Sequence, residues 1–436
     1  MTCLRISQFG ARRSVGTGAV VVLTCFAVTA CDLDVQNPGP VSDDFLDNAT
    51  AHEAMANGAM VALADALTTT AYTTGASTRE IFPAGSTSAF GISASQQRGI
   101  LRFDDEHISW TSHQRARSVA ENAVERFESN SAVNVATYPP AAAAALWAGY
   151  ANRLLGDAFC QAVLNGGPVQ PRTVFYEAAE SWFTRAIEIA TGASRPNMAL
   201  AARAGRASVR ANLGNWSGAV SDAVQIPDDF VFNMEYTAQQ SDQYNRIYWA
   251  TANQPYRAHT VWNTFYEDYY AETNDPRTPW GSNPDIPLGD AALGLLGGAR
   301  APWLFQLKHD RQNAPIRLSS GWEMRLTEAE ALLVEGQWQA AMPLINKHRT
   351  SLGLDPWTVS SLNEAWAMYK RERGIELWLE GRRIADLRRW SENNAPGDLH
   401  PLEQAGNPDS YLDANQSLCI PIPKAEYETN SNLTLP

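Results

Sequence analysis

Basic residues are scarce in this chain. Among its 436 residues, 34 lysines and arginines stand against 47 aspartates and glutamates, which leaves a formal net charge of −13. Proteins that bind a phosphate backbone need a positively charged face. The charge balance therefore argues against nucleic acid as a partner, but it does not identify the molecule that the chain binds.

Long hydrophobic runs are missing as well. The apolar stretch over residues 19–28 is too short to span a bilayer as a stable helix. It follows Arg12 and Arg13, and this order of residues is typical of an export signal. The stretch ends in small residues before Cys31, a pattern similar to a lipobox. We therefore expect a lipoprotein signal peptide over residues 1–30 and acylation of Cys31, with an ordinary cleavage site before a cysteine as the alternative.

A polar segment follows that cysteine at once. Residues 31–42 contain few apolar side chains that could pack, so we expect an extended tether there. The rest of the chain, residues 43–436, has the composition of a globular protein, 44% hydrophobic and 19% charged over the whole sequence. We expect residues 43–436 to form a single domain.

Cysteines are few, five in the whole chain. Cys3 and Cys25 would leave with the signal peptide and Cys31 would be lipidated, so only Cys160 and Cys419 remain. A disulfide between these two is permitted in an exported protein. Two separate buried thiols are the favoured expectation, because free cysteine packs as a small hydrophobic residue.

Sequence motifs of common catalytic and metal sites are also absent. The run over residues 289–298 has no lysine of a phosphate-binding loop, and His52-Glu53 is not followed by a second histidine at the spacing of a zinc protease. Neither Cys-x-x-Cys, Gly-x-Ser-x-Gly nor an EF-hand loop occurs. We expect no catalytic residue, metal ion or cofactor, and no enzyme activity. A carboxylate pair that hydrolyses glycosides stays open, because space and not motif sets such pairs.

Helical periodicity runs through most of the chain and predicts a mostly all-α fold with a few short strands. The expected helices cover residues 43–66, 106–129, 140–162, 173–191, 197–213, 216–224, 322–336, 338–351 and 361–391. Between them lie connections rich in serine, threonine, glycine and proline, notably 68–99 and 273–320. Long connections of this kind in a compact protein usually have a function or are disordered.

A repeat appears inside the helical part. Glycines at 156, 214 and 336 each follow a similar helical segment, and the last two continue alike, as Gly214-Asn-Trp-Ser-Gly-Ala and Gly336-Gln-Trp-Gln-Ala-Ala. This is the turn of a tetratricopeptide-type hairpin, in which glycine ends the first helix and small residues let the second pack closely. We expect an irregular stack of such hairpins, with a loop-rich insertion at about 225–320. Such a scaffold does not by itself say what is bound.

The most unusual stretch is Tyr369–Trp390, which we expect to be one continuous helix. Its apolar residues lie on most faces of the expected helix, which indicates that other parts of the protein contact this helix on several sides. Glu372, Glu376 and Glu380 stand four apart, where like charges repel. Arginines from neighbouring elements would best explain this ridge. We favour paired structural charges over catalytic acids, because such networks also perturb pKa values without doing chemistry.

Several segments resemble the SusD/RagB family of outer-membrane nutrient-binding lipoproteins. They are "NDPR" at 274–277, "APIRLSSGWEMRLTEAEALL" at 314–333, "RERGIELWLEGRRIADLRRW" at 371–390 and "CIPIPKAEYETNSNLTLP" at 419–436, together with the lipobox, the tether and the hairpins. The resemblance implies that the third segment is a structural signature. The signature residues here are Arg277, Glu372, Arg373, Glu376, Glu380, Arg382, Asp386 and Trp390.

The same resemblance implies a function. It indicates a protein anchored to the outer membrane through Cys31 and facing the cell exterior. This protein would bind a glycan or another nutrient, such as a peptide, and would act as a lid on a SusC-like, TonB-dependent transporter. The alternatives are a surface glycan hydrolase and a tetratricopeptide adaptor that binds protein partners.

Aromatic residues are dense between residues 244 and 303. Trp and Tyr rings stack on the flat faces of sugars while nearby amides meet the hydroxyl groups, so this part is the expected ligand surface. For any single aromatic residue, packing in the core is the favoured alternative, because several recur at helical spacing. The candidate ligand-binding residues are Trp249, Trp262, Tyr266, Tyr269, Tyr270, Trp280, Asn263 and Asn274.

Overall fold

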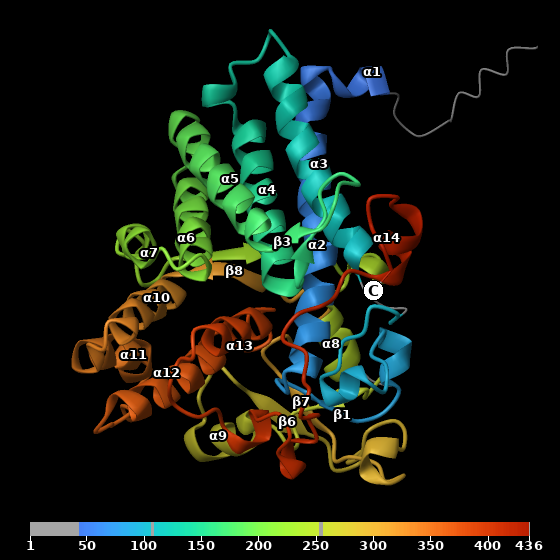
Figure 1. Ribbon diagram of the computed structural model, residues 1–436, viewed down its shortest axis with the longest axis vertical. Coiled ribbons are helices and arrows are strands. Elements are labelled where there is room, and N and C mark those ends of the chain that lie inside the picture. The colour runs from blue at the N-terminus through green and yellow to red at the C-terminus, as the bar shows by residue number, and fades with distance from the viewer. Residues whose placement is uncertain (1–42, 106–108, 253–255, 436) are drawn as a thin grey trace, which may run out of the picture. The chain divides into compact units, whose positions relative to one another are not determined.

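The computed structural model describes residues 43–105, 109–252 and 256–435 (Figure 1). The expected signal peptide, Cys31 and the tether lie outside these ranges. From Asp43 onward the described chain forms one unit. Its core is helical, as the sequence predicts, and its strands are short and pair only two by two.

The expected helices form with changed ends, but those expected at 43–66 and 361–391 are each split in two, and the helices at 246–251, 265–273 and 424–429 are not among the expected ones. The α-helices are α1 (Asp43–Leu46), α2 (His52–Ser77), α3 (Trp110–Ser129), α4 (Pro139–Ala158), α5 (Thr173–Gly192), α6 (Pro196–Asn212), α7 (Trp216–Ala223), α8 (Arg246–Thr251), α9 (Phe265–Thr273), α10 (Gly321–Val334), α11 (Trp338–Ser351), α12 (Leu362–Glu376), α13 (Arg383–Glu392) and α14 (Lys424–Thr429).

Short 3₁₀ turns complete the helical part. They are η1 (Ala49–Ala51), η2 (Thr87–Phe90), η3 (Gln96–Arg98), η4 (Val135–Thr137), η5 (Ser241–Gln243), η6 (Gly294–Leu296), η7 (Pro401–Glu403) and η8 (Pro408–Ser410).

The strands form four antiparallel pairs. These are β1 (Phe82–Pro83) with β5 (His259–Thr260), β2 (Gln161–Ala162) with β3 (Gln170–Pro171), β4 (Val231–Met234) with β8 (Ile316–Ser320), and β6 (Trp280–Ser282) with β7 (Leu304–Gln306). Three of the four pairs include a strand from the predicted insertion at 225–320. Two of these pairs, β4 with β8 and β6 with β7, lie wholly within the insertion, and β5 joins it to the connection at 68–99 through β1. The connection 273–320 is therefore not structureless.

Small residues let α4, α5 and α6 approach closely. The Phe183 ring of α5 lies between Gly149 of α4 and Gly205 of α6. A Cβ atom added at these glycines would come within 2.6 and 2.4 Å of that ring, far inside van der Waals contact. Figure 1 shows α3, α4, α5 and α6 side by side in chain order. The alanine and glycine content of these helices is thus a packing requirement.

The predicted hairpin turns form at two of the three glycines. Gly214 and Gly336 follow α6 and α10 with φ of 75° and 76°, a conformation that favours glycine. The next helices, α7 and α11, pack back on α6 and α10, and α7 also contacts α10. Gly156 does not end a helix. It lies inside α4, where the Tyr176 ring occupies the space that a Cβ would fill.

The expectation of one helix across Tyr369–Trp390 is wrong. Helix α12 ends at Glu376 and α13 begins at Arg383. Between them Leu379 and Gly381 have positive φ values of 58° and 71°. A tight turn is required here because Gly381 lies against Ala71 of α2, where a Cβ would come within 3.2 Å of the Ala71 Cα. The apolar residues of the segment are buried in three different clusters: Ile375, Trp378 and Leu379 in the one that includes α2, Ile384 in one near the end of α4, and Leu387 and Trp390 in one with α10 and α11.

Helix α2 is longer than predicted and replaces part of the expected loop at 68–99. It continues to Ser77, although its last three turns are rich in threonine. Burial explains the difference, since Thr70, Thr74 and Thr78 each donate a hydroxyl hydrogen bond to the carbonyl four residues earlier. These hydroxyls are satisfied inside the helix and can be buried without loss.

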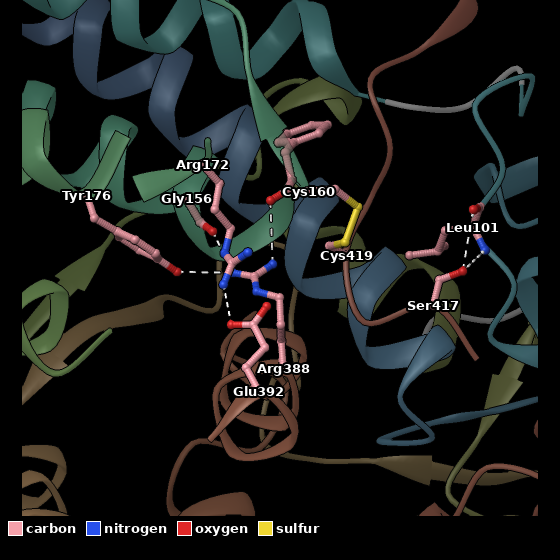
Figure 2. The surroundings of a disulfide bond; sticks show 10 residues. Leu101, Gly156, Cys160, Arg172, Tyr176, Arg388, Glu392, Ser417 and Cys419 are labelled. Atoms are coloured by element: carbon pink, nitrogen blue, oxygen red, sulfur yellow. Dashed lines mark hydrogen bonds and ion pairs between the residues drawn. A yellow bond between two sulfur atoms is a disulfide. The ribbon is translucent and has the colours of Figure 1, made fainter. Parts of the chain in front are cut away.

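Two buried thiols were the favoured expectation for Cys160 and Cys419, and this expectation is wrong. The structure joins them in a disulfide across 259 residues of sequence (Figure 2). The adjacent backbones hold the two segments together, because Cys160 N–H donates to the Ile420 carbonyl and Ile420 N–H to the Ala158 carbonyl. Sequence separation gave no sign of this pairing, which depends on the carboxy-terminal segment returning to the end of α4.

Removing the disulfide should lower the stability of the fold. We expect the double variant Cys160→Ser, Cys419→Ser to lose roughly 2–5 kcal/mol of unfolding free energy, because the bond closes a very long loop. The check is thermal or urea unfolding with and without reductant. Reductant should lower the midpoint of the wild type and leave the double variant unchanged. Alkylation that labels both cysteines in the native, unreduced protein would contradict the assignment.

Candidate functional site

The signature segment places its glutamates inside the protein, against cations from other elements. Glu376 of α12 is 1% exposed and accepts from Arg277 at 3.0 Å and from Arg317 at 2.9 Å. His348 of α11 lies 2.6 Å from the same carboxylate. Arg277 also reaches Glu372 at 2.6 Å. The predicted pairing of this acidic ridge with neighbouring cations is confirmed, and it joins four segments that are distant in sequence.

Asp275 and Glu380 extend this network at its two ends. Arg277 donates to Asp275 at 2.7 Å, which fixes the turn after α9. Glu380 accepts from Arg317 and from Lys308, each at 2.7 Å. The "NDPR" segment therefore joins the turn after α9 to the buried network.

A second group of buried ion pairs surrounds α13. Arg373 contacts Asp386 at 2.7 Å, and Arg389 contacts Asp386 at 2.9 Å. Arg382 reaches Glu323 of α10 at 2.8 Å. The Trp390 indole, 3% exposed, donates to Glu330 at 2.8 Å. Each arginine therefore has a carboxylate partner and each charge is compensated.

The cations decide the ionisation of these carboxylates. Burial alone would raise the pKa of Glu376, but Arg317, His348 and Arg277 outweigh it and hold the pKa well below its usual value. Burial is likewise overcome at Asp386, where Arg373 and Arg389 bring the pKa to about 2. Both carboxylates stay charged at neutral pH. A general acid would need the opposite shift, so we interpret these residues as structural.

Two of the predicted ligand-binding residues are buried. Tyr266 is fully buried and stacks on Trp378, with ring centroids 4.9 Å apart. Tyr269 is 5% exposed and donates to Asp275 at 2.5 Å. Both lie on the inner face of α9, as their helical spacing suggested. They have no face left for a ligand, and we leave them out of the candidate site.

Four other candidates have structural contacts of their own. Asn263 and Asn274 adopt positive φ at the two ends of α9, a conformation that asparagine tolerates well. Trp262 packs edge-on against Phe82, with centroids 5.2 Å apart. The Trp280 indole donates to the Glu267 carbonyl.

The Tyr270–Trp280 pair remains partly exposed. Its two rings meet at 5.9 Å, with an interplanar angle of 63°. This pair lies between α9 and β6.

Trp249 of α8 belongs to a row of partly exposed rings. Tyr244 lies 4.6 Å from it on one side, and Tyr256 lies 6.0 Å from it on the other at an interplanar angle of 22°. Tyr256 is 39% exposed and meets the edge of Phe90. We call Tyr244, Trp249 and Tyr256 the aromatic platform.

Local structure explains how the platform is held. The Asn245 side chain caps α8 by accepting from the N–H groups of Ile247 and Tyr248. It also donates to the Ala314 carbonyl, which ties the start of α8 to the segment before β8. Asn245 itself is buried, so its side chain serves this structural role.

A pocket of about 210 Å³ opens beside the platform. It is lined by Asp65, Thr68, Ala89, Phe90, Ser241, Asp242, Tyr244, Arg246 and Trp249. The Arg246 guanidinium is fixed there by a 2.6 Å hydrogen bond to the Phe90 carbonyl. The pocket thus combines flat rings with carboxylates, hydroxyls and a guanidinium, which suits a ligand with many hydroxyl groups.

Burial raises the pKa of Asp65, and the nearby Asp242 adds to this shift, whereas Arg246 opposes it. Two carboxylates therefore share one pocket. Sequence reasoning missed Asp65, Asp242, Arg246 and Phe90. Asp65 and Phe90 lie far from the aromatic-dense stretch in the chain, so only the packing of α2 and η2 against α8 brings them there.

No metal centre is built into the described ranges: no three histidine, cysteine or acidic side chains come close enough together there to hold an ion. None of the helices in these ranges combines the length and apolar character that a membrane span requires.

Residues 308–434 match the model of the SusD family. This range includes β8, α10 to α14 and Cys419. No curated protein matches the chain by sequence.

Solved structures match over most of the chain. A SusD-like protein from Bacteroides fragilis is 14% identical and has a TM-score of 0.66, covering 91% of this chain and 98% of its own. A SusD-like carbohydrate binding protein from Bacteroides vulgatus is 16% identical, with a TM-score of 0.54 and coverages of 78% and 83%. A laminarin binding SusD-like protein is 14% identical, with a TM-score of 0.58 and coverages of 87% and 98%. At these identities the likeness establishes the fold.

The structural role of the glutamate ridge can be tested at Glu376. We expect Glu376→Gln to lose about 3–5 kcal/mol of unfolding free energy, because Arg277 and Arg317 lose a buried counter-charge. The lowered pKa of Glu376 adds stability above the pKa of the unfolded state, and this contribution is lost as pH falls. The acid-induced loss of stability should therefore be shallower in the variant.

Unfolding by urea at several pH values measures both effects. Glu335→Gln, at an exposed acid after α10, is the matched control and should behave like the wild type. Unchanged stability in Glu376→Gln would show that the ridge does not hold the fold together.

Proposed function

The chain belongs to the SusD/RagB family by its carboxy-terminal match and its fold, and from this premise we propose that it is a cell-surface lipoprotein that captures a glycan for uptake. The ligand is an oligo- or polysaccharide, and the chain delivers it as a lid to a SusC-like, TonB-dependent transporter in the outer membrane. The bound glycan is not cleaved by this protein.

The observation that supports capture is the aromatic platform beside its polar pocket. Three partly exposed rings pack against one another there, and two of them, Tyr244 and Trp249, line the pocket. A sugar ring can stack through its C–H groups on an aromatic face that stays exposed. Asp65, Asp242 and Arg246 stand at the same pocket and can hydrogen-bond hydroxyl groups. Relatives of the same fold include a laminarin binding protein, which agrees with a glycan as the class of ligand.

A second candidate function is hydrolysis of the captured glycan. It is favoured by one observation, the presence of Asp65 and Asp242 at one pocket with a raised pKa at Asp65. A glycosidase needs one carboxyl as a proton donor and a second carboxylate as nucleophile or base. We favour binding alone, because Arg246 opposes the pKa shift and both acids also serve as hydroxyl acceptors.

Delivery requires that the chain stay beside the transporter. Acylation of Cys31 and the tether over residues 31–42 would supply this, because a short flexible link keeps the lid at high effective concentration. Co-purification of the chain with a β-barrel transporter from detergent-solubilised outer membranes is the corresponding check on the partner.

Trp249 provides the test of the capture site. Glycan-array screening and calorimetry identify the ligand, and Trp249→Ala should then weaken its affinity about tenfold or more, because the central ring of the platform is lost. Trp280→Ala is the matched comparison: it removes a partly exposed tryptophan at the Tyr270–Trp280 pair and should leave affinity unchanged.

The opposite pattern, a loss at Trp280 and none at Trp249, would place the site at that pair. Shortened products after incubation of the wild type with the bound glycan, absent in Asp65→Asn, would replace capture by hydrolysis.

Anchoring is tested separately at Cys31. Cys31→Ser should move the protein from the membrane fraction to the soluble fraction and abolish labelling by a fatty-acid probe. Cys25→Ser, at the other cysteine close to the expected cleavage site, should leave both unchanged. Full membrane retention of Cys31→Ser would contradict the lipid anchor without bearing on the glycan pocket.

A further inference from the structure

Arg79 is a buried cation without a counter-charge. Its side chain is 0% exposed, and it follows α2 with a positive φ of 66°. Among the described residues no ion pair reaches it. The Nη2 atom donates to the Gln97 carbonyl at 3.1 Å, whereas Nε and Nη1 have no hydrogen-bond partner.

Other buried arginines of the described ranges, such as Arg373, Arg383 and Arg389, form ion pairs with carboxylates. Within these ranges Arg388 forms none, but it donates to two backbone carbonyls and to the Tyr176 hydroxyl. Arg79 differs from all of them in having two unpartnered nitrogen atoms and no ion pair in the described part of the chain.

The surroundings of Arg79 add positive charge. Burial, together with the charge of the neighbouring Arg98, lowers the pKa of Arg79 to about 9. The side chain therefore remains charged at neutral pH. The Phe82 ring, 4.8 Å from the guanidinium carbon, offers a cation–π contact but no hydrogen-bond acceptor. Glu80, the next residue, forms no ion pair with Arg79: its Oε1 accepts from the Leu379 N–H, and its Oε2 has no hydrogen-bond partner among the described residues.

His259 is a second buried group with an unused nitrogen in this region. It lies on β5, which pairs with β1 just after Arg79. Its Nδ1 is 3.0 Å from the Tyr72 hydroxyl, and its Nε2 has no partner. Burial lowers the pKa of His259 to about 3, and the charge of Arg79 contributes to this shift. With Tyr72 donating to Nδ1, the neutral ring carries its proton on Nε2 and is one more donor.

We propose that a monoatomic anion of the size and charge of chloride is bound in the interior against the Nε and Nη1 atoms of Arg79, near His259. A buried guanidinium that lacks a counter-charge costs several kcal/mol, and a water molecule would satisfy its N–H groups without neutralising it. The side chains of Arg79 and His259 are fully buried, so the ligand is small and is enclosed as the chain folds.

The anion would stabilise the connection between α2 and α3. Arg79 holds Gln97, and the Gln97 side chain donates to Thr87 at 2.8 Å. Thr87 begins the turn η2, which contains Ala89 and Phe90 of the glycan pocket. The site is distinct from that pocket, and its existence does not depend on the proposed function.

Crystals of the full chain grown with bromide in place of chloride provide the direct test. An anomalous bromide peak at hydrogen-bonding distance from Arg79 Nε or Nη1 is the expected result. A peak only at the surface, or density at Arg79 without anomalous signal, would overturn the proposal, because it would mean an adventitious halide or a water molecule.

Thermal unfolding provides a second, independent measurement. At constant ionic strength, replacing gluconate by chloride should raise the midpoint of the wild type by a constant step for each tenfold increase in chloride, as expected for a ligand that binds only the folded state. Arg79→Gln should abolish this dependence, and Arg311→Gln, at an exposed arginine paired with Asp310, should retain it. If Arg79→Gln does not fold, the wild-type chloride series and the bromide map test the proposal without it. Equal unfolding midpoints of the wild type in chloride and in gluconate would contradict the proposal.

Discussion

The fold depends on one buried carboxylate that several distant segments share. Glu376 accepts from Arg277 after α9, from Arg317 of β8 and from His348 of α11. None of these charges would be stable in the interior alone, because desolvation of an unpaired ion costs several kcal/mol. The three segments and α12 must therefore assemble together, and the insertion at 225–320 becomes part of the core. This explains why like charges four residues apart can occur on one helix.

The charged core also sets the position of the candidate site. Arg317 fixes β8, and the chain just before β8 accepts from Asn245, which caps α8. Trp249 on α8 is therefore connected to the Glu376 network through the backbone of α8 and of the segment before β8, and its own ring takes no part in this connection. A platform held in this way loses little conformational freedom when a ligand binds, which favours affinity. The catalytic interpretation of the ridge fails for the same reason, since its carboxylates are paired with fixed cations and are at most 2% exposed.

Much of the helical body follows from local signals in the sequence. Gly214 and Gly336 end their helices as predicted, because glycine adopts a positive φ without steric strain. The glutamates of the signature segment also indicated that cations from other elements would lie beside them, because a buried carboxylate requires a counter-charge. The break after Glu376, the length of α2 and the Cys160–Cys419 bond were not predictable in the same way, since each depends on a contact between distant segments.

The ligand site was the least predictable part. Aromatic density indicated residues 244–303 as the ligand surface, but Tyr266 and Tyr269 are buried, and no pattern in the sequence brings Asp65 or Phe90 to Trp249. Helical spacing distinguished the buried rings from the exposed ones only in part. Exposed and buried tryptophans occur in the same local sequence patterns. Whether a given tryptophan is exposed or buried therefore depends on packing against distant elements, here α2 and η2.

The central claim is that a glycan binds at the aromatic platform without being cleaved. A crystal structure of the chain with its bound glycan tests this most directly. We predict an intact sugar ring stacked on Trp249, with its hydroxyls within hydrogen-bonding distance of Asp65, Asp242 or Arg246. A glycan bound elsewhere with the platform empty, or a cleaved product in the pocket, would contradict it.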